Sequence, residues 1–279
     1  MGAIRTHVVR TARGIAASLR SPPYTAPGHY YSPATSGADR ERAVDWRDLE
    51  PTGIDLDERG QEQLVRDLAT LMTELPEDRW QPGNEMYGRA DAAVLHAMLR
   101  HHRPGRLLEV GSGYSTAVAL DVVERHLPGL RITCVEPNPE RLRSRLREGD
   151  DVSVVEAPAQ EVPVATFAEL TAGDILFIDS THVLKSGSDV AWLYLHVLPA
   201  LAPGVLVHVH DVHWPFEYPE AWIREWRDWT EVYVLRAFLT HNAAWRLRLM
   251  TSWVWSARPQ LVPESLRHHP TGSLWMQRT

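Results

Sequence analysis

A glycine-rich turn stands between an apolar run and a helical segment, in the pattern of a site for a nucleotide-like ligand. The apolar run 107–110 predicts a buried strand, and Gly111, Ser112 and Gly113 follow it directly. Glycine lets the backbone approach a ligand closely, and the start of the next helix offers unpaired N–H groups. We expect Ser115 to cap that helix, which the pattern extends to about residue 127.

An acidic residue follows the next predicted strand. The β-rich run 131–135 is followed by Glu136, about 20 residues after the turn, where a carboxylate binds ribose hydroxyls. Dinucleotide folds require a third glycine where this chain has Thr116, because a pyrophosphate brings the helix very close. S-adenosylmethionine has no phosphate, and we therefore favour it as the ligand.

Carboxylates and imidazoles follow two further predicted strands. Asp179 and His182 follow one of them, and His210 and Asp211 follow the other. These strands are neighbours in a doubly wound sheet, so the side chains should meet at the carboxyl edge, where such sheets bind ligands. Carboxylates suit magnesium or manganese, and imidazoles also admit iron, cobalt or zinc. The alternative is a hydrogen-bonded polar rim without an ion.

An aromatic segment follows the last of these strands. It contains His213, Trp214, Phe216 and Tyr218, and two prolines stiffen it. Apolar walls with a few polar groups suit a pocket for the substrate that accepts the transferred group, and aromatic faces bind sugar C–H surfaces. The alternative is that these rings pack into the core.

The elements that position these residues alternate along the chain, which predicts a parallel sheet covered by helices on both faces. The predicted strands are 106–110, 131–135, 152–156, 174–179 and 204–210, and the helices between and after them are 115–127, 138–147, 188–199 and 229–240. Upstream, helices are expected at 61–75 and 84–100, and residues 21–58 look irregular. We expect an N-terminal extension and cap over residues 1–80 and a catalytic domain over 81–279.

Composition limits the classes of function. The chain has 279 residues, 44% of them hydrophobic, and a formal net charge of −7, so no general attraction to nucleic acid is expected. The single cysteine, Cys134, excludes an intramolecular disulfide and a cysteine-rich zinc site. No apolar run has transmembrane length. The basic N-terminus lacks the apolar core of a signal peptide, and we expect a cytoplasmic protein without an integral membrane segment. Two interpretations of that basic N-terminal segment remain open. It forms either an amphipathic helix that touches a membrane or a partner, or a plain surface helix.

The glycine turn and the downstream acid resemble those of class I S-adenosylmethionine-dependent methyltransferases. The resemblance rests on Glu109-Val110-Gly111-Ser112-Gly113 followed by Glu136. It implies a Rossmann-like, doubly wound, mostly parallel seven-stranded sheet with an N-terminal helical cap, in which 245–250 and 273–277 form a closing antiparallel pair. It also implies a cofactor site in which Glu136 binds the ribose. The other cofactor-binding residues that we infer are Glu109, Gly111, Ser112, Gly113 and Ser115 near the methionine part, and Ala159 and Gln160 beside the adenine.

More narrowly, the chain is similar to bacterial sugar and natural-product O-methyltransferases that use a divalent ion. Asp179 matches their aspartate after strand four, and Asp211 matches the second member of their acidic pair after strand five. His210 replaces the first member, and we take Asp179, His210 and Asp211 as the metal ligands. In that group a histidine at the offset of His182 deprotonates the acceptor hydroxyl, so His182 and Asp179 are the expected catalytic residues. An imidazole with a pKa near 6.5 can take up such a proton.

Two upstream stretches also match a branch of those bacterial methyltransferases. They are residues 28–33 and 84–87. A lid over the cofactor, with Tyr31 as a contact, and a structural clamp are the two roles that we weigh for them.

The prediction from sequence is therefore a methyltransferase that O-methylates a hydroxyl on a sugar or secondary metabolite, with a small-molecule or glycan acceptor. Two other classes of function remain open. The first is a metal-dependent lyase, isomerase or oxygenase on a reused fold, in which His182, His210 and Asp211 form a two-histidine, one-carboxylate set. The second is a non-catalytic subunit that binds the cofactor. The acceptor, the metal and any homo-oligomer are left undetermined.

Overall fold

The computed structural model describes residues 24–279, which form two compact units. In the described chain, the smaller unit comprises residues 24–46 and 220–228, and the larger unit comprises 47–219 and 229–279. The division falls after residue 46 and not at the expected residue 80, because the helix Glu58–Met72 packs within the larger unit against the helix Arg89–His102 and the strand Trp245–Met250. The basic N-terminal segment of the sequence analysis lies outside the described residues.

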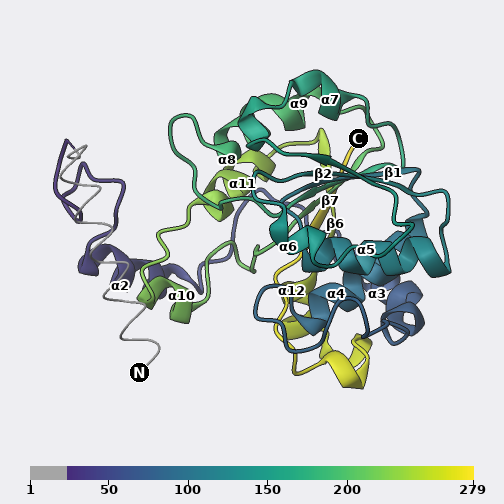
Figure 1. Ribbon diagram of the computed structural model, residues 1–279. Helices are drawn as coiled ribbons and strands as arrows, with labels where there is room; N and C mark the ends of the chain where they lie inside the picture. The colour runs from purple at the N-terminus through teal and green to yellow at the C-terminus, as the bar shows by residue number, and fades with distance from the viewer. Residues whose placement is uncertain (1–23) are drawn as a thin grey trace, which may run out of the picture. The chain divides into compact units, whose positions relative to one another are not determined.

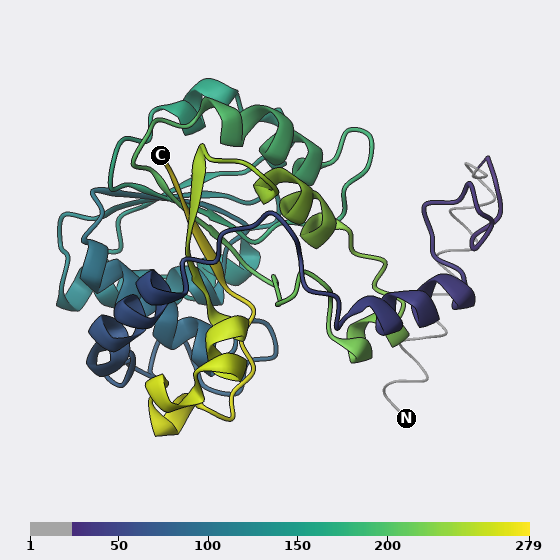
Figure 2. The ribbon, with the colours of Figure 1, turned by 180° about the vertical axis from the view of Figure 1, so that it is seen from behind.

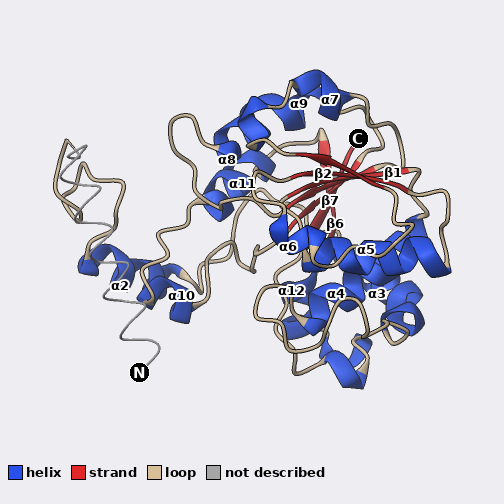
Figure 3. Ribbon diagram, viewed as in Figure 1, coloured by secondary structure: helices blue, strands red, loops and turns tan. Residues whose placement is uncertain are grey.

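The larger unit is built on one seven-stranded sheet. The strands follow the order β3-β2-β1-β4-β5-β7-β6 (Figure 3). All neighbours from β3 to β5 pair in parallel, and β7 runs antiparallel to both β5 and β6. The predicted doubly wound sheet with its closing antiparallel pair is therefore confirmed. The strands are β1 (Arg106–Val110), β2 (Arg131–Val135), β3 (Val152–Val155), β4 (Ile175–Ile178), β5 (Leu206–Val209), β6 (Trp245–Met250) and β7 (Leu274–Arg278).

Helices cover both faces of this sheet (Figure 1). One face carries α3 (Glu58–Met72), α4 (Arg89–His102), α5 (Tyr114–Arg125), α6 (Glu140–Arg143) and α12 (Thr251–Ala257). The other face carries α7 (Val164–Ala168), α8 (Asp189–Trp192), the π-helical turn Leu193–Val197, α9 (Leu198–Ala200) and α11 (Glu231–Leu239). The chain that follows α12, drawn in yellow in Figure 2, contacts α3 through the turn Pro259–Leu261. Short 3-10 turns occupy Ala159–Glu161, Pro259–Leu261 and Glu264–Leu266.

The smaller unit pairs two short helices, α2 (Gly37–Trp46) and α10 (Glu220–Arg224). The sequence prediction of irregular chain over 21–58 missed α2, because its residues lack an apolar stripe. Ser36 and Asp39 start this helix, since the Asp39 N–H donates to the Ser36 hydroxyl and the Asp39 carboxylate accepts from the Ser36 N–H. Across residues 24–279, no helix is long and apolar enough to cross a membrane.

Several helices of the larger unit differ from their predicted bounds, and three of these differences bear on the site. The helix predicted from residue 84 begins at Arg89, because the Asn84 side chain accepts the N–H groups of Met86 and Tyr87 in a tight turn. The helix predicted over 138–147 is a single turn, after which the Ser144 hydroxyl donates to the Arg141 carbonyl. Ser115 does not cap α5, which begins one residue earlier, after Gly113.

The start of α5 depends on a buried carboxylate of β1. The hydroxyls of Ser115 and Thr116 both donate to Glu109, and the Thr116 hydroxyl also accepts the Gly113 N–H. Glu109 has no solvent exposure. These bonds tie the glycine turn to the strand beneath it, so that the turn keeps one conformation.

Gly111 lies where β1 approaches β4 too closely for any side chain. Its φ of +82° is in the left-handed region, and a Cβ built there would meet the Asp179 carbonyl oxygen at 1.9 Å. The neighbouring Asp179 N–H donates to Val110 over 2.9 Å. The turn therefore requires glycine at this position for both its backbone angle and its clearance.

We predict that Gly111→Ala lowers the free energy of unfolding by about 2 kcal/mol or more, because alanine meets both the angular strain and the clash. Gly129→Ala is the matched control, since a Cβ there has nothing within 4 Å. It should change stability by less than about 0.5 kcal/mol. Urea denaturation of both variants measures the difference, and equal stabilities would contradict the argument.

Candidate functional site

The candidate site lies at the carboxyl edge of the sheet, where the backbone ladder continues one residue past each strand. At each of these positions the N–H donates to the last residue of the neighbouring strand. The four bonds are Gly111 to Val135 (3.0 Å), Glu136 to Val155 (3.0 Å), Asp179 to Val110 (2.9 Å) and His210 to Ile178 (2.9 Å). Four residues predicted from sequence to act at the site are thereby held in one row.

A pocket of about 430 Å³ opens along this row. Of the predicted cofactor residues, Gly111, Glu136, Ala159 and Gln160 line it, and Asp179 lies at its border with the metal-ligand candidates. Most of its other lining residues belong to the loop that follows Asp179, namely Ser180, Thr181, Val183, Lys185 and Gly187 to Asp189. Both the volume and the mixed lining suit a ligand of nucleoside size.

Glu136 joins the glycine turn to the loop after β2. Its carboxylate accepts the N–H of Ser112 at 3.2 Å and the N–H of Asn138 at 2.8 Å. It is partly exposed and lines the pocket. A carboxylate fixed in this way is preorganised to accept the two hydroxyls of a ribose.

The other predicted cofactor residues of the larger unit do not line the pocket. Glu109 is buried beneath the turn, and Gly113 is buried against Arg141, whose Cδ would be 2.8 Å from an added Cβ. Ser112 contributes its N–H to Glu136, and Ser115 contributes its hydroxyl to Glu109. Tyr31 belongs to the smaller unit, where 68% of its surface is exposed. The turn residues therefore support the pocket from behind.

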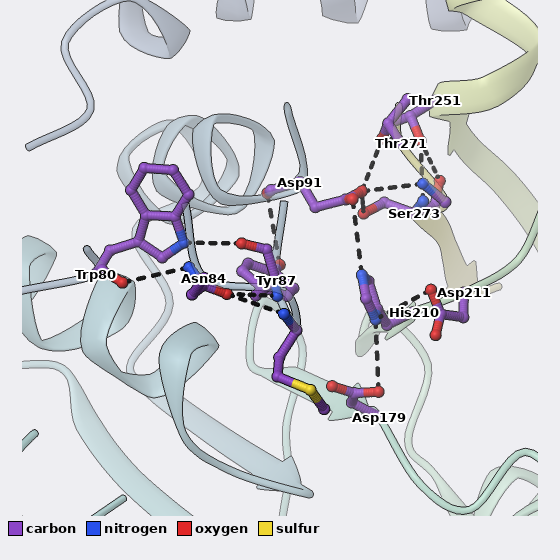
Figure 4. Close-up of polar contacts among 12 residues, drawn as sticks. Trp80, Asn84, Tyr87, Asp91, Asp179, His210, Asp211, Thr251, Thr271 and Ser273 are labelled. Atoms are coloured by element: carbon purple, nitrogen blue, oxygen red, sulfur yellow. Dashed lines mark hydrogen bonds and ion pairs between the residues drawn. The ribbon is translucent and has the colours of Figure 1, made fainter. Parts of the chain in front are cut away.

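Three predicted metal ligands do come together. The ligand atoms of Asp179, His210 and Asp211 all lie within 4.8 Å of one another (Figure 4). His210 Nδ1 is 3.4 Å from Asp179 Oδ1 and 3.6 Å from Asp211 Oδ1. This ring is 4% exposed, and its Nδ1 has no hydrogen-bond partner among the described residues. One imidazole nitrogen facing two carboxylates is a donor set that fits a divalent cation.

The carboxylates and imidazoles of this cluster shift one another's pKa values. Burial alone would lower the pKa of His210, but Asp211, Asp179 and Asp91 outweigh it and raise that pKa well above 6.5. Burial would raise the pKa of Asp179, but His210 and His182 reverse this and keep it below its usual value. Without a cation, protons on the imidazoles therefore balance the carboxylates.

His182 faces the same two carboxylates from another side. Its Nε2 lies 3.5 Å from Asp179 and 3.6 Å from Asp211, and its Nδ1 is 2.8 Å from the buried Glu231. Its ring also packs against Trp229, at 4.3 Å between centroids. Burial opposes its protonation, but Asp179 and Glu231 raise its pKa to about 10. The pKa near 6.5 assumed from sequence does not apply to this arrangement.

Two of these residues adopt a backbone conformation that is uncommon outside glycine. His182 has φ of +60° and Asp211 has φ of +58°. Left-handed conformations at non-glycine residues cost energy and concentrate at functional sites. Here they point one imidazole and one carboxylate at the same place.

The predicted substrate residues are divided between core and surface. Phe216 and Tyr218 are buried, and the Tyr218 hydroxyl accepts the Val232 N–H at 3.2 Å. Their rings therefore pack into the core, as the alternative interpretation expected. His213 and Trp214 are partly exposed, and the Trp214 N–H is held by Ser252.

Sequence reasoning missed three residues that belong to this region. Asp91 of α4 lies 3.7 Å from His210 Nε2, and Glu231 of α11 holds His182. A signal for Asp91 was available, because it is the one acid within the otherwise apolar run 90–95. Lys185, the only lysine of the sequence, is the one cationic residue among the described residues that line the pocket.

Comparison with known proteins supports the class that the geometry indicates. Residues 108–212, which run from β1 past β5, match the model of a family described as a methyltransferase domain. The matched segment contains the glycine turn, Glu136 and all three metal-ligand candidates. The sheet topology and the match over residues 108–212 support the class I S-adenosylmethionine-dependent methyltransferase domain that the sequence predicted.

Individual relatives are distant. An uncharacterised protein of Archaeoglobus fulgidus is 28% identical over 160 residues, which cover 52% of this chain and 72% of that protein. Podospora anserina methyltransferase PaMTH1, solved with S-adenosylhomocysteine, aligns at 16% identity with a TM-score of 0.47, covering 88% of this chain and 97% of that chain. The plantazolicin methyltransferase BpumL, solved with a desmethylplantazolicin analogue and S-adenosylhomocysteine, aligns at 13% identity with a TM-score of 0.46, covering 81% of this chain and all of that one.

The buried Glu109 predicts a pH dependence of stability. Burial raises its pKa from 4.5 to about 7, although Ser115 and Thr116 oppose the rise. Since the folded-state value is the higher one, the folded protein holds the extra proton, and Glu109 contributes less stability as pH rises from 4.5 towards 7. Glu109→Gln stays neutral, so its free energy of unfolding relative to the wild type should rise across this window by up to about 3 kcal/mol.

Chemical denaturation at a series of pH values measures this difference. Glu156→Gln, at an exposed position after β3, is the control for the loss of one carboxylate. A difference between Glu109→Gln and the wild type that does not change with pH would rule out a proton on Glu109.

Proposed function

We propose that this methyltransferase transfers a methyl group to a hydroxyl oxygen of a sugar or secondary metabolite, assisted by a divalent cation and His182. The observation that carries the proposal is the convergence of Asp179, His210, Asp211 and His182 at the border of the pocket assigned to the cofactor. When bound, S-adenosylmethionine supplies a methyl group that its sulfonium already activates, so the protein mainly aligns the reactants and manages one proton.

The pocket supports a definite orientation for the cofactor. Glu136 would accept the ribose hydroxyls, Ala159 and Gln160 would flank the adenine, and Gly111 would admit the methionine part. This orientation directs the reactive end of the cofactor towards Asp179, which lines the same pocket.

The divalent cation would be held by Asp179, His210 and Asp211. The buried Nδ1 of His210, without a hydrogen-bond partner in the described chain, favours a cation over a purely hydrogen-bonded rim. A bound divalent cation lowers the pKa of a coordinated hydroxyl. Magnesium, manganese and ferrous ion all suit a set of two carboxylates and one imidazole.

His182 is placed to take the proton of the acceptor. Glu231 contacts its Nδ1, which leaves Nε2 directed at the carboxylates. With those carboxylates uncompensated, the pKa of about 10 keeps the ring protonated at neutral pH. A cation that neutralises Asp179 and Asp211 would remove much of the negative charge that holds this proton. Cation binding would therefore lower the pKa of His182 and allow it to act as the base.

Calorimetric titration of S-adenosylhomocysteine into the protein tests the cofactor part of the proposal. We expect micromolar binding to the wild type and about tenfold weaker binding to Glu136→Ala, because hydrogen bonds to a charged carboxylate are lost. Glu156→Ala, which removes an exposed acid after the neighbouring strand, is the matched control and should bind as the wild type does.

Two outcomes would contradict the proposal in different ways. If the wild type does not bind S-adenosylhomocysteine, with or without magnesium, the proposed methyltransferase activity is wrong. If Glu136→Ala and the wild type bind S-adenosylhomocysteine equally, the proposed activity stands but the assignment of Glu136 to the ribose is wrong. Transfer of labelled methyl groups to a panel of sugars and phenols, with magnesium or with chelator, then tests the acceptor class and the need for a cation.

One observation favours a second candidate function. Both His182 and His210 approach the same two carboxylates, so the site also offers the two-histidine, one-carboxylate set of iron enzymes. Turnover that requires ferrous ion and proceeds without a methyl donor would favour an iron-dependent lyase, isomerase or oxygenase. If the protein binds S-adenosylhomocysteine but shows no turnover, the interpretation as a non-catalytic subunit remains.

A further inference from the structure

We propose that Asp91 is a positioning residue that sets the ring orientation of His210 so that Nδ1 binds the cation. This inference rests on the proposed metal site and extends it by a residue from outside the sheet. Asp91 lies on α4, and His210 lies between it and the pair Asp179 and Asp211 (Figure 4). The His210 ring thus meets Asp91 at its Nε2 edge and both Asp179 and Asp211 at its Nδ1 edge, and only the Nδ1 edge faces the site.

Asp91 is itself held firmly. Its Oδ1 accepts three hydrogen bonds, from the Thr271 hydroxyl at 2.7 Å, the Gly272 N–H at 3.1 Å and the Ser273 hydroxyl at 2.7 Å. The side chain is buried, and no cationic side chain other than His210 pairs with it in the described chain. Its Oδ2 is left to face His210 Nε2 at 3.7 Å.

This geometry divides the two nitrogens of His210 between two tasks. A carboxylate beside Nε2 keeps a proton there, so Nδ1 can present its lone pair when a cation is bound. The ring also packs on Tyr87, with centroids 4.9 Å apart, and Tyr87 is fixed by the Asn84 side chain and by a bond from Trp80 Nε1 to its carbonyl. A ring held from its face and from one edge has little freedom to turn away.

The same carboxylate also supports the segment beside Asp211. The Gly272 carbonyl accepts the Val212 N–H at 2.8 Å, and a Cβ at Gly272 would come within 3.3 Å of the Asp211 Cα. Through Gly272, Asp91 therefore braces the backbone that carries Asp211. Two of the three proposed ligands depend on one buried acid of α4.

Manganese binding to the full-length protein, measured by electron paramagnetic resonance, tests this role without a need for turnover. We expect Asp91→Asn to bind manganese about 10- to 100-fold more weakly than the wild type, the loss typical for a carboxylate that orients a ligating histidine. An amide at this position can donate to Nε2, which moves the imidazole proton to Nδ1 and blocks the lone pair. S-adenosylhomocysteine affinity should stay unchanged, because Asp91 does not line that pocket.

Asp174→Asn is the matched control. Asp174 is also buried and also accepts three hydrogen bonds, from the Arg106 N–H, the Thr171 N–H and the Thr171 hydroxyl, but it lies at the opposite edge of the sheet. Its substitution should lower stability and leave manganese affinity intact. If Asp91→Asn does not fold, Ser273→Ala removes one of the donors that hold Asp91, and a smaller loss of manganese affinity is expected.

A double substitution separates positioning from general support. In a His210→Asp background there is no imidazole to orient, and Asp91 faces another carboxylate. The side-chain oxygen of an asparagine at position 91 can still accept the three hydrogen bonds that Asp91 accepts, so the support of Asp211 is kept. Adding Asp91→Asn there should therefore leave manganese binding unchanged or tighter, so the effects of the two substitutions will not add. An equal loss in both backgrounds would mean that Asp91 only supports the fold and would overturn the inference.

The failures are distinguishable. Manganese binding that is equal in the wild type and Asp91→Asn would overturn this inference and leave the proposed metal site. If the wild type binds S-adenosylhomocysteine but not manganese, both the proposed metal site and this inference are wrong. The proposed methyltransferase activity would then still stand.

Discussion

The close approach of β1 to β4 at Gly111 is the constraint on which the rest of the site depends. No side chain fits between Gly111 and the Asp179 carbonyl, and the ladder that runs through this contact continues to His210. The pocket proposed for the cofactor and the proposed metal ligands are therefore parts of one rigid edge. Because backbone hydrogen bonds set their spacing, substitutions in the surrounding loops can change the acceptor without moving the reacting groups.

Charge is the second organising feature. Asp91, Asp179, Asp211 and Glu231 surround two imidazoles in a largely buried volume, and like charges at such distances are costly unless a cation or protons intervene. The carboxylates raise the pKa values of both histidines, so protons on the imidazoles can supply this compensation. The proposed divalent cation would supply the same compensation and would leave His182 free to accept a proton.

The sequence was most informative where backbone rules apply. Strand ends align in a parallel sheet, so Glu136, Asp179 and His210 were placed together correctly from their positions after apolar runs. Contacts made by helix packing could not be read in this way, because a helix can present Asp91 or Glu231 to many partners. Phe216, Tyr218 and Glu109 were predicted to contact a ligand but are buried in the core, because the residue types that suit a ligand site also suit the core. Ser115 illustrates the same limit, as its hydroxyl reaches a buried carboxylate instead of capping α5.

The most direct test of this account is an anomalous diffraction experiment on crystals grown with S-adenosylhomocysteine and manganese. The account predicts one manganese peak in contact with Asp179, His210 and Asp211, next to a cofactor product whose ribose meets Glu136. A manganese peak elsewhere, or a cofactor product outside the pocket at the carboxyl edge of the sheet, would contradict it.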